Sequence, residues 1–158
     1  MSKPSRATDV VDAKLNTPRT FFITSNTWER RQLFRSARMA KLFLDVLYHY
    51  RTESRFLLHD FCLMPDHFHL LITVKPDTTI EKVVQLIKGG FSFRAARELG
   101  FGGEIWQRGF SEHQIRDPQS FQTRRDYIAQ NAVHRKLASQ PEDYEYGAYV
   151  LDKPCPNS

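Results

Sequence analysis

The sequence predicts an α+β domain built on a four-stranded antiparallel sheet. Stretches rich in apolar and β-branched residues alternate with stretches whose apolar residues recur every three or four positions. In chain order they give strand, helix, strand, strand, helix and strand, followed by one more helix. This order is that of the split βαβ, or ferredoxin-like, arrangement, in which two helices pack on one face of the sheet. The additional C-terminal helix carries a tyrosine.

The composition fits one globular domain that could bind a polyanion. The chain has 158 residues, 41% of them hydrophobic, and its net charge of +5 permits a partner such as nucleic acid. Its two cysteines form no metal-binding or disulfide pattern, and no apolar run of about 18 residues is present. We therefore expect a cytoplasmic protein with a flexible arm over residues 1–17, a single domain over 18–151 and a loose tail over 152–158.

The chain should begin its folded part with a strand and a helix. Residues 19–28 are rich in Phe, Ile and Thr, which favours a strand. An apolar stripe with helical spacing follows and predicts a helix over residues 33–51. The stripe consists of Leu33, Ala37, Ala40, Leu44 and Leu47.

A hairpin comes next. Residues 55–64 are apolar on both faces of a strand, with Leu58 expected on one face and Phe61 on the other. Residues 65–66 are Pro-Asp, which suits a tight turn. The chain should therefore return as an antiparallel strand over residues 67–75.

The second helix should begin at a capping box, with Thr78 as the N-cap and Glu81 at the third helical position. Its core face is predicted to contain Ile80, Val84, Ile87, Phe91 and Ala95. The pair Gly89–Gly90 lies in its middle and costs about 1 kcal/mol per glycine relative to alanine. Such a pair indicates a bend or the close approach of another group.

The last part of the chain should supply the fourth strand and the tyrosine helix. Residues 104–116 are expected to form an irregular strand. Asp117 is a good N-cap because proline follows it in the first turn. The helix should then cover about residues 119–138.

Two histidines provide the first candidate for chemistry. His67 and His69 are two positions apart in the predicted strand and therefore point to the same face. Two adjacent imidazoles can supply half of a metal site. Taken alone, however, this pattern is more often part of a solvated face.

The tyrosine helix offers the second half of such a site. Tyr127 and Asn131 are four residues apart and share one face of the helix. If this face looks at the two histidines, two imidazoles and an amide oxygen make a three-ligand metal site with open positions. Tyr127 would then be placed as a nucleophile. The remaining histidines stay open as ligands: His49, His59, His113 and His134.

These motifs together resemble the single-tyrosine (HUH, Y1) transposases of the IS200 type, most closely the REP-associated tyrosine transposase branch. The resemblance covers about residues 21–149. It rests on five segments in the family's order, namely Met64–Leu71, Lys88–Gly89, Ile105–Arg108, Tyr127–Asn131 and Pro141–Tyr144.

The resemblance implies a metal-dependent enzyme that nicks and rejoins single-stranded or hairpin DNA, without a nucleotide cofactor or a membrane. His67, His69 and Asn131 would hold Mg²⁺ or Mn²⁺, and Tyr127 would form a 5′-phosphotyrosine link. Because metal binding needs neutral imidazoles, activity should fall below about pH 6.5. The candidate DNA-binding residues are Arg30, Arg31, Lys88, Trp106, Arg108 and Arg124. The protein could act as a monomer or as a homodimer.

Two other classes of function stay open. Ferredoxin-like sheets that carry aromatic residues also occur in modules that bind single-stranded nucleic acid without catalysis. The histidine pair would also suit a zinc hydrolase, since imidazole is a good zinc ligand. Neither class needs the hydroxyl of Tyr127, so a Tyr127→Phe variant distinguishes them from a transposase.

Overall fold

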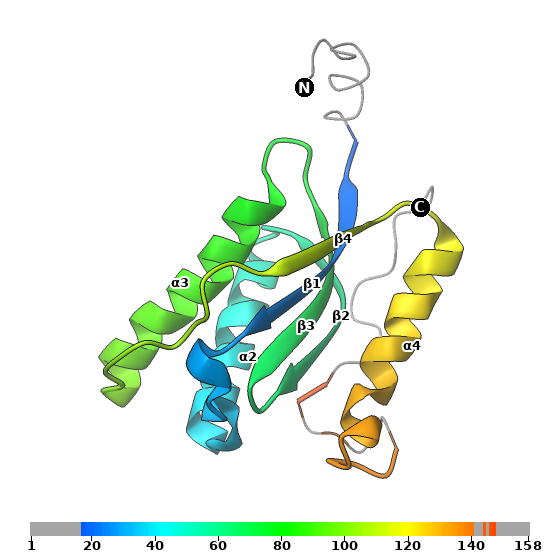
Figure 1. The fold of residues 1–158 in the computed structure, drawn as a ribbon. Coiled ribbons are helices and arrows are strands. Elements are labelled where there is room, and N and C mark those ends of the chain that lie inside the picture. Colours follow the sequence, from blue (N-terminus) through cyan, green and yellow to red (C-terminus); the bar gives the residue numbers. More distant parts are fainter. Residues whose placement is uncertain (1–16, 141–143, 145, 148–158) are drawn as a thin grey trace.

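A four-stranded antiparallel sheet forms the middle layer of the structure (Figure 1). The computed structural model describes residues 17–140, 144, 146 and 147. The strands lie in the order β2-β3-β1-β4, which confirms the predicted fold. Their bounds are Arg19–Asn26 for β1, Leu57–Met64 for β2, His67–Val74 for β3 and Ser111–Ile115 for β4.

Helices cover both faces of this sheet. Helices α2 (Ala37–Thr52) and α3 (Ile80–Leu99) pack together on one face, and α4 (Pro118–His134) packs on the opposite face against β2 and β3 (Figure 1). Two short 3-10 turns, η1 (Trp28–Arg30) and η2 (Leu33–Arg35), join β1 to α2. None of the described helices is both long and apolar enough to cross a membrane.

The alternation of side chains along each strand divides the core between the two faces. Phe21 and Ile23 of β1 and Leu70 of β3 belong to the large core beneath α2 and α3. Phe22 and Leu71 belong to a smaller apolar cluster, which α4 covers with Ile128. The histidines of β3 have the same parity as Leu71, so they face α4.

Several predicted boundaries differ from the structure. The predicted helix over 33–51 is instead the turn η2 followed by α2, which begins after Ser36 because its hydroxyl accepts a hydrogen bond from Met39 N. Thr79, rather than Thr78, is the N-cap of α3 and accepts from Lys82 N. Helix α4 begins after the predicted cap, Asp117, and ends at His134 instead of near residue 138.

A β-bulge in β2 makes one prediction wrong, namely that Leu58 and Phe61 lie on opposite faces of the strand. Leu58 pairs with Ile72 and Asp60 pairs with Leu71, so His59 is the extra residue. The bulge shifts the alternation by one position, and Leu58 and Phe61 therefore both enter the large core instead of opposite faces.

The terminal parts of the chain lie outside this description. Residues 1–16, most of the predicted arm, are not among the described residues, nor is the predicted tail over 152–158. The same holds for residues 141–143, which belong to the Pro141–Tyr144 segment of the resemblance.

Candidate active site

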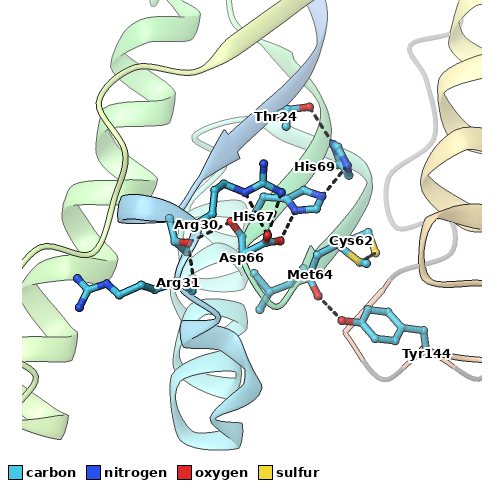
Figure 2. A network of polar contacts seen from close by, with 11 residues as sticks. Thr24, Arg30, Arg31, Cys62, Met64, Asp66, His67, His69 and Tyr144 are labelled. Carbon is cyan, nitrogen blue, oxygen red and sulfur yellow. Dashed lines mark hydrogen bonds and ion pairs between the residues drawn. The ribbon is translucent and has the colours of Figure 1, made fainter. Parts of the chain in front are cut away.

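The two histidines of β3 form a buried pair on the face of the sheet that α4 covers. The Nε2 atoms of His67 and His69 lie 3.2 Å apart, and the two rings meet edge to face (Figure 2). Both side chains are almost completely excluded from solvent. The predicted convergence of the two imidazoles is therefore present in the structure.

The Nδ1 atom of each imidazole makes a hydrogen bond to a neighbouring side chain. His67 Nδ1 lies 2.7 Å from Asp66 Oδ1, and His69 Nδ1 lies 2.8 Å from Thr24 Oγ1. The second oxygen of Asp66 accepts a hydrogen bond from Arg30 Nε at 3.1 Å and forms an ion pair with Arg30 Nη2 at 2.8 Å. These contacts leave both Nε2 atoms on the side where the rings converge (Figure 2).

Burial lowers the pKa of both imidazoles. The pKa of His69 falls to about 3, with further contributions from the charges of His67, Arg135 and Arg124. Asp66 opposes the effect of burial at His67, but the pKa of His67 still lies below its ordinary value. Both shifts favour the neutral imidazoles that metal binding requires. The expected fall of activity below about pH 6.5 stays a prediction.

At Asp66, the effect of burial on the pKa is outweighed by the effect of the neighbouring charges. Burial alone would raise the pKa of its carboxyl group, but the hydrogen bond and charge of His67, together with Arg30, lower it. Asp66 is therefore a carboxylate at neutral pH and can only accept hydrogen bonds.

Tyr127 reaches this pair from α4. Its ring packs edge-on against His69, with the ring centroids 5.3 Å apart, and also against Phe22 at 5.8 Å. The residue nevertheless remains 46% exposed. The phenol is thus next to the imidazoles and still open to a large substrate.

Asn131 lies one helical turn further along the same face of α4. Helix α4 runs antiparallel to β3, because Phe121 contacts His59 near one end of the sheet and Tyr127 contacts His69. The turn that carries Asn131 is therefore displaced toward the His67 end of β3. Asn131 is buried, and its Nδ2 atom has no hydrogen-bond partner in the described part of the chain.

These side chains fit a divalent cation. Among the described residues, no group of three His, Cys, Asp or Glu side chains is arranged to hold a metal ion, so a site here needs the amide as well. Two neutral imidazoles with their Nδ1 atoms already engaged, and the amide oxygen of the buried Asn131, are the groups that could meet that need. The other candidate histidines lie elsewhere. His59 is hydrogen-bonded to Thr73, His49 lies beside Glu53 on α2, and His113 and His134 are exposed.

The candidate DNA-binding residues have different surroundings. Arg124 stacks on Phe22, with its guanidinium carbon 4.7 Å from the ring centre, and therefore lies close to Tyr127. Arg108 is exposed, whereas Arg30 is paired with Asp66 and Arg31 donates to the carbonyl of Glu104. Their predicted contacts with DNA stay predictions.

Lys88 and Trp106 have structural partners within the chain. Lys88 Nζ donates to the carbonyls of Gln107 and Gly109, and Trp106 Nε1 donates to the carbonyl of Lys88. The Trp106 ring packs against the large core, including Phe43 and Phe68. These contacts fasten the segment before β4 onto α3. Both side chains remain partly exposed, and their predicted contacts with DNA stay predictions.

Two important neighbours were missed at the level of sequence. Asp66 was interpreted only as a turn residue, although its position directly before His67 was a usable signal. Thr24 gave no signal, because it meets His69 only through the pairing of β1 with β3.

Comparison with known proteins places the chain in a family. The model of a family described as IS200-like transposases matches residues 21–131, about two thirds of the sequence. The chain belongs to this family. A REP-associated tyrosine transposase of Haemophilus influenzae is 30% identical to it over 101 residues, which are 58% of this chain and 57% of that protein. The chain therefore spans little more than half the length of this curated relative.

Solved structures show the same fold. A REP-associated tyrosine transposase bound to a REP hairpin superposes with a TM-score of 0.65 and 25% identity, over 82% of this chain and 75% of that one. A transposase of Deinococcus radiodurans superposes with a TM-score of 0.54 and 20% identity, over 76% of this chain and 92% of that one. The second match supports the fold alone.

Proposed function

We propose that this IS200-like transposase nicks and rejoins single-stranded DNA through a covalent link to Tyr127. The observation that carries the proposal is the contact of the exposed Tyr127 ring with His69, whose Nε2 lies 3.2 Å from that of His67. A nucleophile and two candidate metal ligands are thus adjacent, as a reaction at one phosphorus atom requires.

The reaction would exchange one phosphodiester for another. The Tyr127 hydroxyl loses its proton and attacks the scissile phosphate, and the bond from phosphorus to the 3′ oxygen breaks. The downstream strand remains on the tyrosine as a 5′-phosphotyrosine, while the upstream strand leaves with a 3′-hydroxyl. Attack by a 3′-hydroxyl on this link then restores the phosphodiester and releases the tyrosine, so that no ATP is needed.

His67, His69 and Asn131 would hold Mg²⁺ or Mn²⁺ for this reaction. The cation would polarise the phosphate and neutralise the negative charge that develops on its oxygens. Arg124, which stacks on Phe22 beside the tyrosine, would contribute a fixed positive charge at the same place.

The substrate we propose is DNA that carries a hairpin, probed with a REP-type sequence. The support is the structural neighbour that was solved with a REP hairpin, together with the net charge of +5 of this chain. Helix α4 packs on the sheet of its own chain. We therefore propose that a monomer suffices and that Tyr127 acts with the histidines of the same chain.

The test uses two end-labelled copies of one hairpin-bearing single strand, incubated with the full chain and Mn²⁺. With a 3′ label, we expect a protein–DNA band that resists SDS, and with a 5′ label a shorter free fragment. Tyr127→Phe should remove both products while hairpin binding persists. Tyr48→Phe, on α2, is the matched control and should behave like the parent. An adduct that survives in Tyr127→Phe, or hairpin binding without any cleavage by the parent, would overturn the proposal.

A further inference from the structure

The two imidazoles of the site cannot have equivalent protonation. Their Nε2 atoms lie 3.2 Å apart, so in the absence of a cation one of them must donate a hydrogen and the other must accept it. Two bare lone pairs would repel at this distance, and so would two N–H groups. The partners of the Nδ1 atoms decide which ring donates.

Asp66 decides the form of His67. A carboxylate only accepts, so the 2.7 Å contact is a hydrogen bond that His67 donates from Nδ1. A neutral imidazole has one N–H, and His67 Nε2 must therefore carry the lone pair. It follows that His69 donates from Nε2 to His67, and that His69 Nδ1 accepts from the hydroxyl of Thr24 at 2.8 Å.

Thr24 differs from Asp66 because a hydroxyl can either donate or accept. A cation that takes the lone pairs of both Nε2 atoms requires His69 to carry its hydrogen on Nδ1 instead. Thr24 tolerates this change by accepting where it had donated. The proton leaves Nε2 for water and another enters at Nδ1, so the ring stays neutral.

We propose that Asp66 and Thr24 are positioning residues with unequal roles, in which Asp66 fixes His67 in the ligand tautomer and Thr24 lets His69 change tautomer when a cation binds. This inference rests on the proposed metal site and adds to it the residues that prepare each ligand. It predicts that one histidine is ready for the cation and that the other must rearrange.

The surroundings of Asp66 show how firmly it is held. Glu29 and Arg30 both have left-handed backbones, with φ of 54° and 55°, a conformation that is strained for residues other than glycine. This turn brings the Arg30 guanidinium onto one oxygen of Asp66, so that the other faces His67 (Figure 2). Thr27 N also donates to the carbonyl of Asp66 at 3.0 Å. The connection after β1 thus clamps the turn that precedes the histidine strand.

Imidazole ¹⁵N spectra of the full chain test the assignment directly. Without metal, we expect His67 to carry its hydrogen on Nδ1 and His69 on Nε2. Added Mg²⁺ should move the hydrogen of His69 to Nδ1 and leave His67 unchanged. A metal-free His67 with its hydrogen on Nε2, or a His69 whose tautomer stays the same while Mg²⁺ binds, would overturn the inference.

Variants separate the two roles. In Asp66→Asn the amide can present an N–H to His67 and select the wrong tautomer, so we expect Mn²⁺ affinity to fall roughly 10- to 100-fold. Asp77→Asn removes the same charge beyond the other end of β3 and should leave the affinity unchanged. Unchanged affinity in Asp66→Asn would contradict the role of Asp66.

For Thr24, the hydroxyl is tested by comparing Thr24→Val with Thr24→Ser. We expect the valine variant to lose about tenfold or more in Mn²⁺ affinity and the serine variant to regain it. Thr20→Val, on the same face of β1, removes a hydroxyl that contacts Thr73 instead and serves as control. Equal affinities of the valine and serine variants would contradict the proposal. The spectra succeed or fail independently of the Tyr127→Phe cleavage test, so failure of the tautomer assignment is distinguishable from failure of the proposed function.

Discussion

Asn131 is the candidate metal ligand on α4, and its amide nitrogen makes no hydrogen bond with a described residue that would explain its burial. It is buried on α4, yet Nδ2 finds no partner within the described residues. An unsatisfied buried polar atom costs about 1–3 kcal/mol. Nδ2 can only donate, so a cation would bind the amide oxygen of Asn131 instead.

Replacement of Asn131 by alanine should therefore separate binding from stability. We expect Mn²⁺ affinity to fall by roughly tenfold or more, since even partners of a metal ligand contribute 10- to 100-fold. The free energy of unfolding should change by about 1 kcal/mol or less, because the lost packing is offset by removal of the unsatisfied amide. Titration calorimetry and urea unfolding measure the two quantities. Gln130→Ala, an exposed neighbour, is the control, and an unchanged affinity in Asn131→Ala would exclude it as a ligand.

At this scale, periodicity predicted which residues share a face but not what else they touch. The spacing of His67 and His69 and of Tyr127 and Asn131 was sufficient to place each pair. Nothing in the spacing could show that Lys88 is engaged by two backbone carbonyls, since an exposed lysine and a bonded one look alike in a sequence.

Helix α3 shows the same limit at the scale of an element. The sequence indicated either a bend or a close approach at Gly89–Gly90 and could not distinguish the two glycines. In the structure, a Cβ atom at Gly90 would lie 2.5 Å from the Tyr50 hydroxyl, whereas one at Gly89 would meet nothing within 4 Å. Only Gly90 is explained by an approach, that of Tyr50 from α2.

This difference predicts unequal stabilities for two neighbouring substitutions. Gly89→Ala should raise the free energy of unfolding by about 1 kcal/mol through helix propensity. Gly90→Ala gains the same propensity but must displace the Tyr50 ring, so it should be the less stable of the two variants. Urea unfolding gives both values. In a Tyr50→Leu background the gap between the two should close, and a gap that persists there would show that Tyr50 is not its cause.

The surroundings of helix α4 could be predicted from the sequence only in part. Its cap and its tyrosine face were predicted, but the polar residues beneath it were not. The bulge at His59 turns both His59 and Asp60 toward α4, where they meet Phe121 and Arg125. A bulge shifts the strand's alternation without leaving a signal in hydrophobicity, so no strand pattern could have revealed it.

For the whole molecule, this means that the two faces of the sheet are stabilised differently. The face under α2 and α3 is a continuous apolar core, whereas the face under α4 mixes a small apolar cluster with buried polar groups. Asp60 is the buried acid on that face, and its carboxylate lies 3.9 Å from Arg125 Nε. Burial raises the pKa of Asp60 to about 7, although Phe61 N–H and Arg125 partly oppose it.

The raised pKa links Asp60 to global stability in a defined direction. The folded protein keeps this proton up to about pH 7, whereas the unfolded chain releases it near pH 4, so the folded state binds more protons between these values. The contribution of Asp60 to stability is therefore fully present below about pH 4 and is lost as the pH rises through 7. Between pH 5 and pH 8 the loss amounts to about 2–3 kcal/mol.

Asp60→Asn should remove this dependence, because an amide does not titrate and can still accept from Phe61 N. Urea unfolding at pH 5 and pH 8 should show a smaller difference for the variant than for the parent, by about 2–3 kcal/mol. Asp77→Asn, which alters an exposed acid, should preserve the parent's difference. If the difference in unfolding free energy between the parent and Asp60→Asn is the same at pH 5 and pH 8, then Asp60 is already ionised at pH 5. Its pairing with Arg125 would in that case outweigh the cost of burying the carboxylate beneath the tyrosine helix.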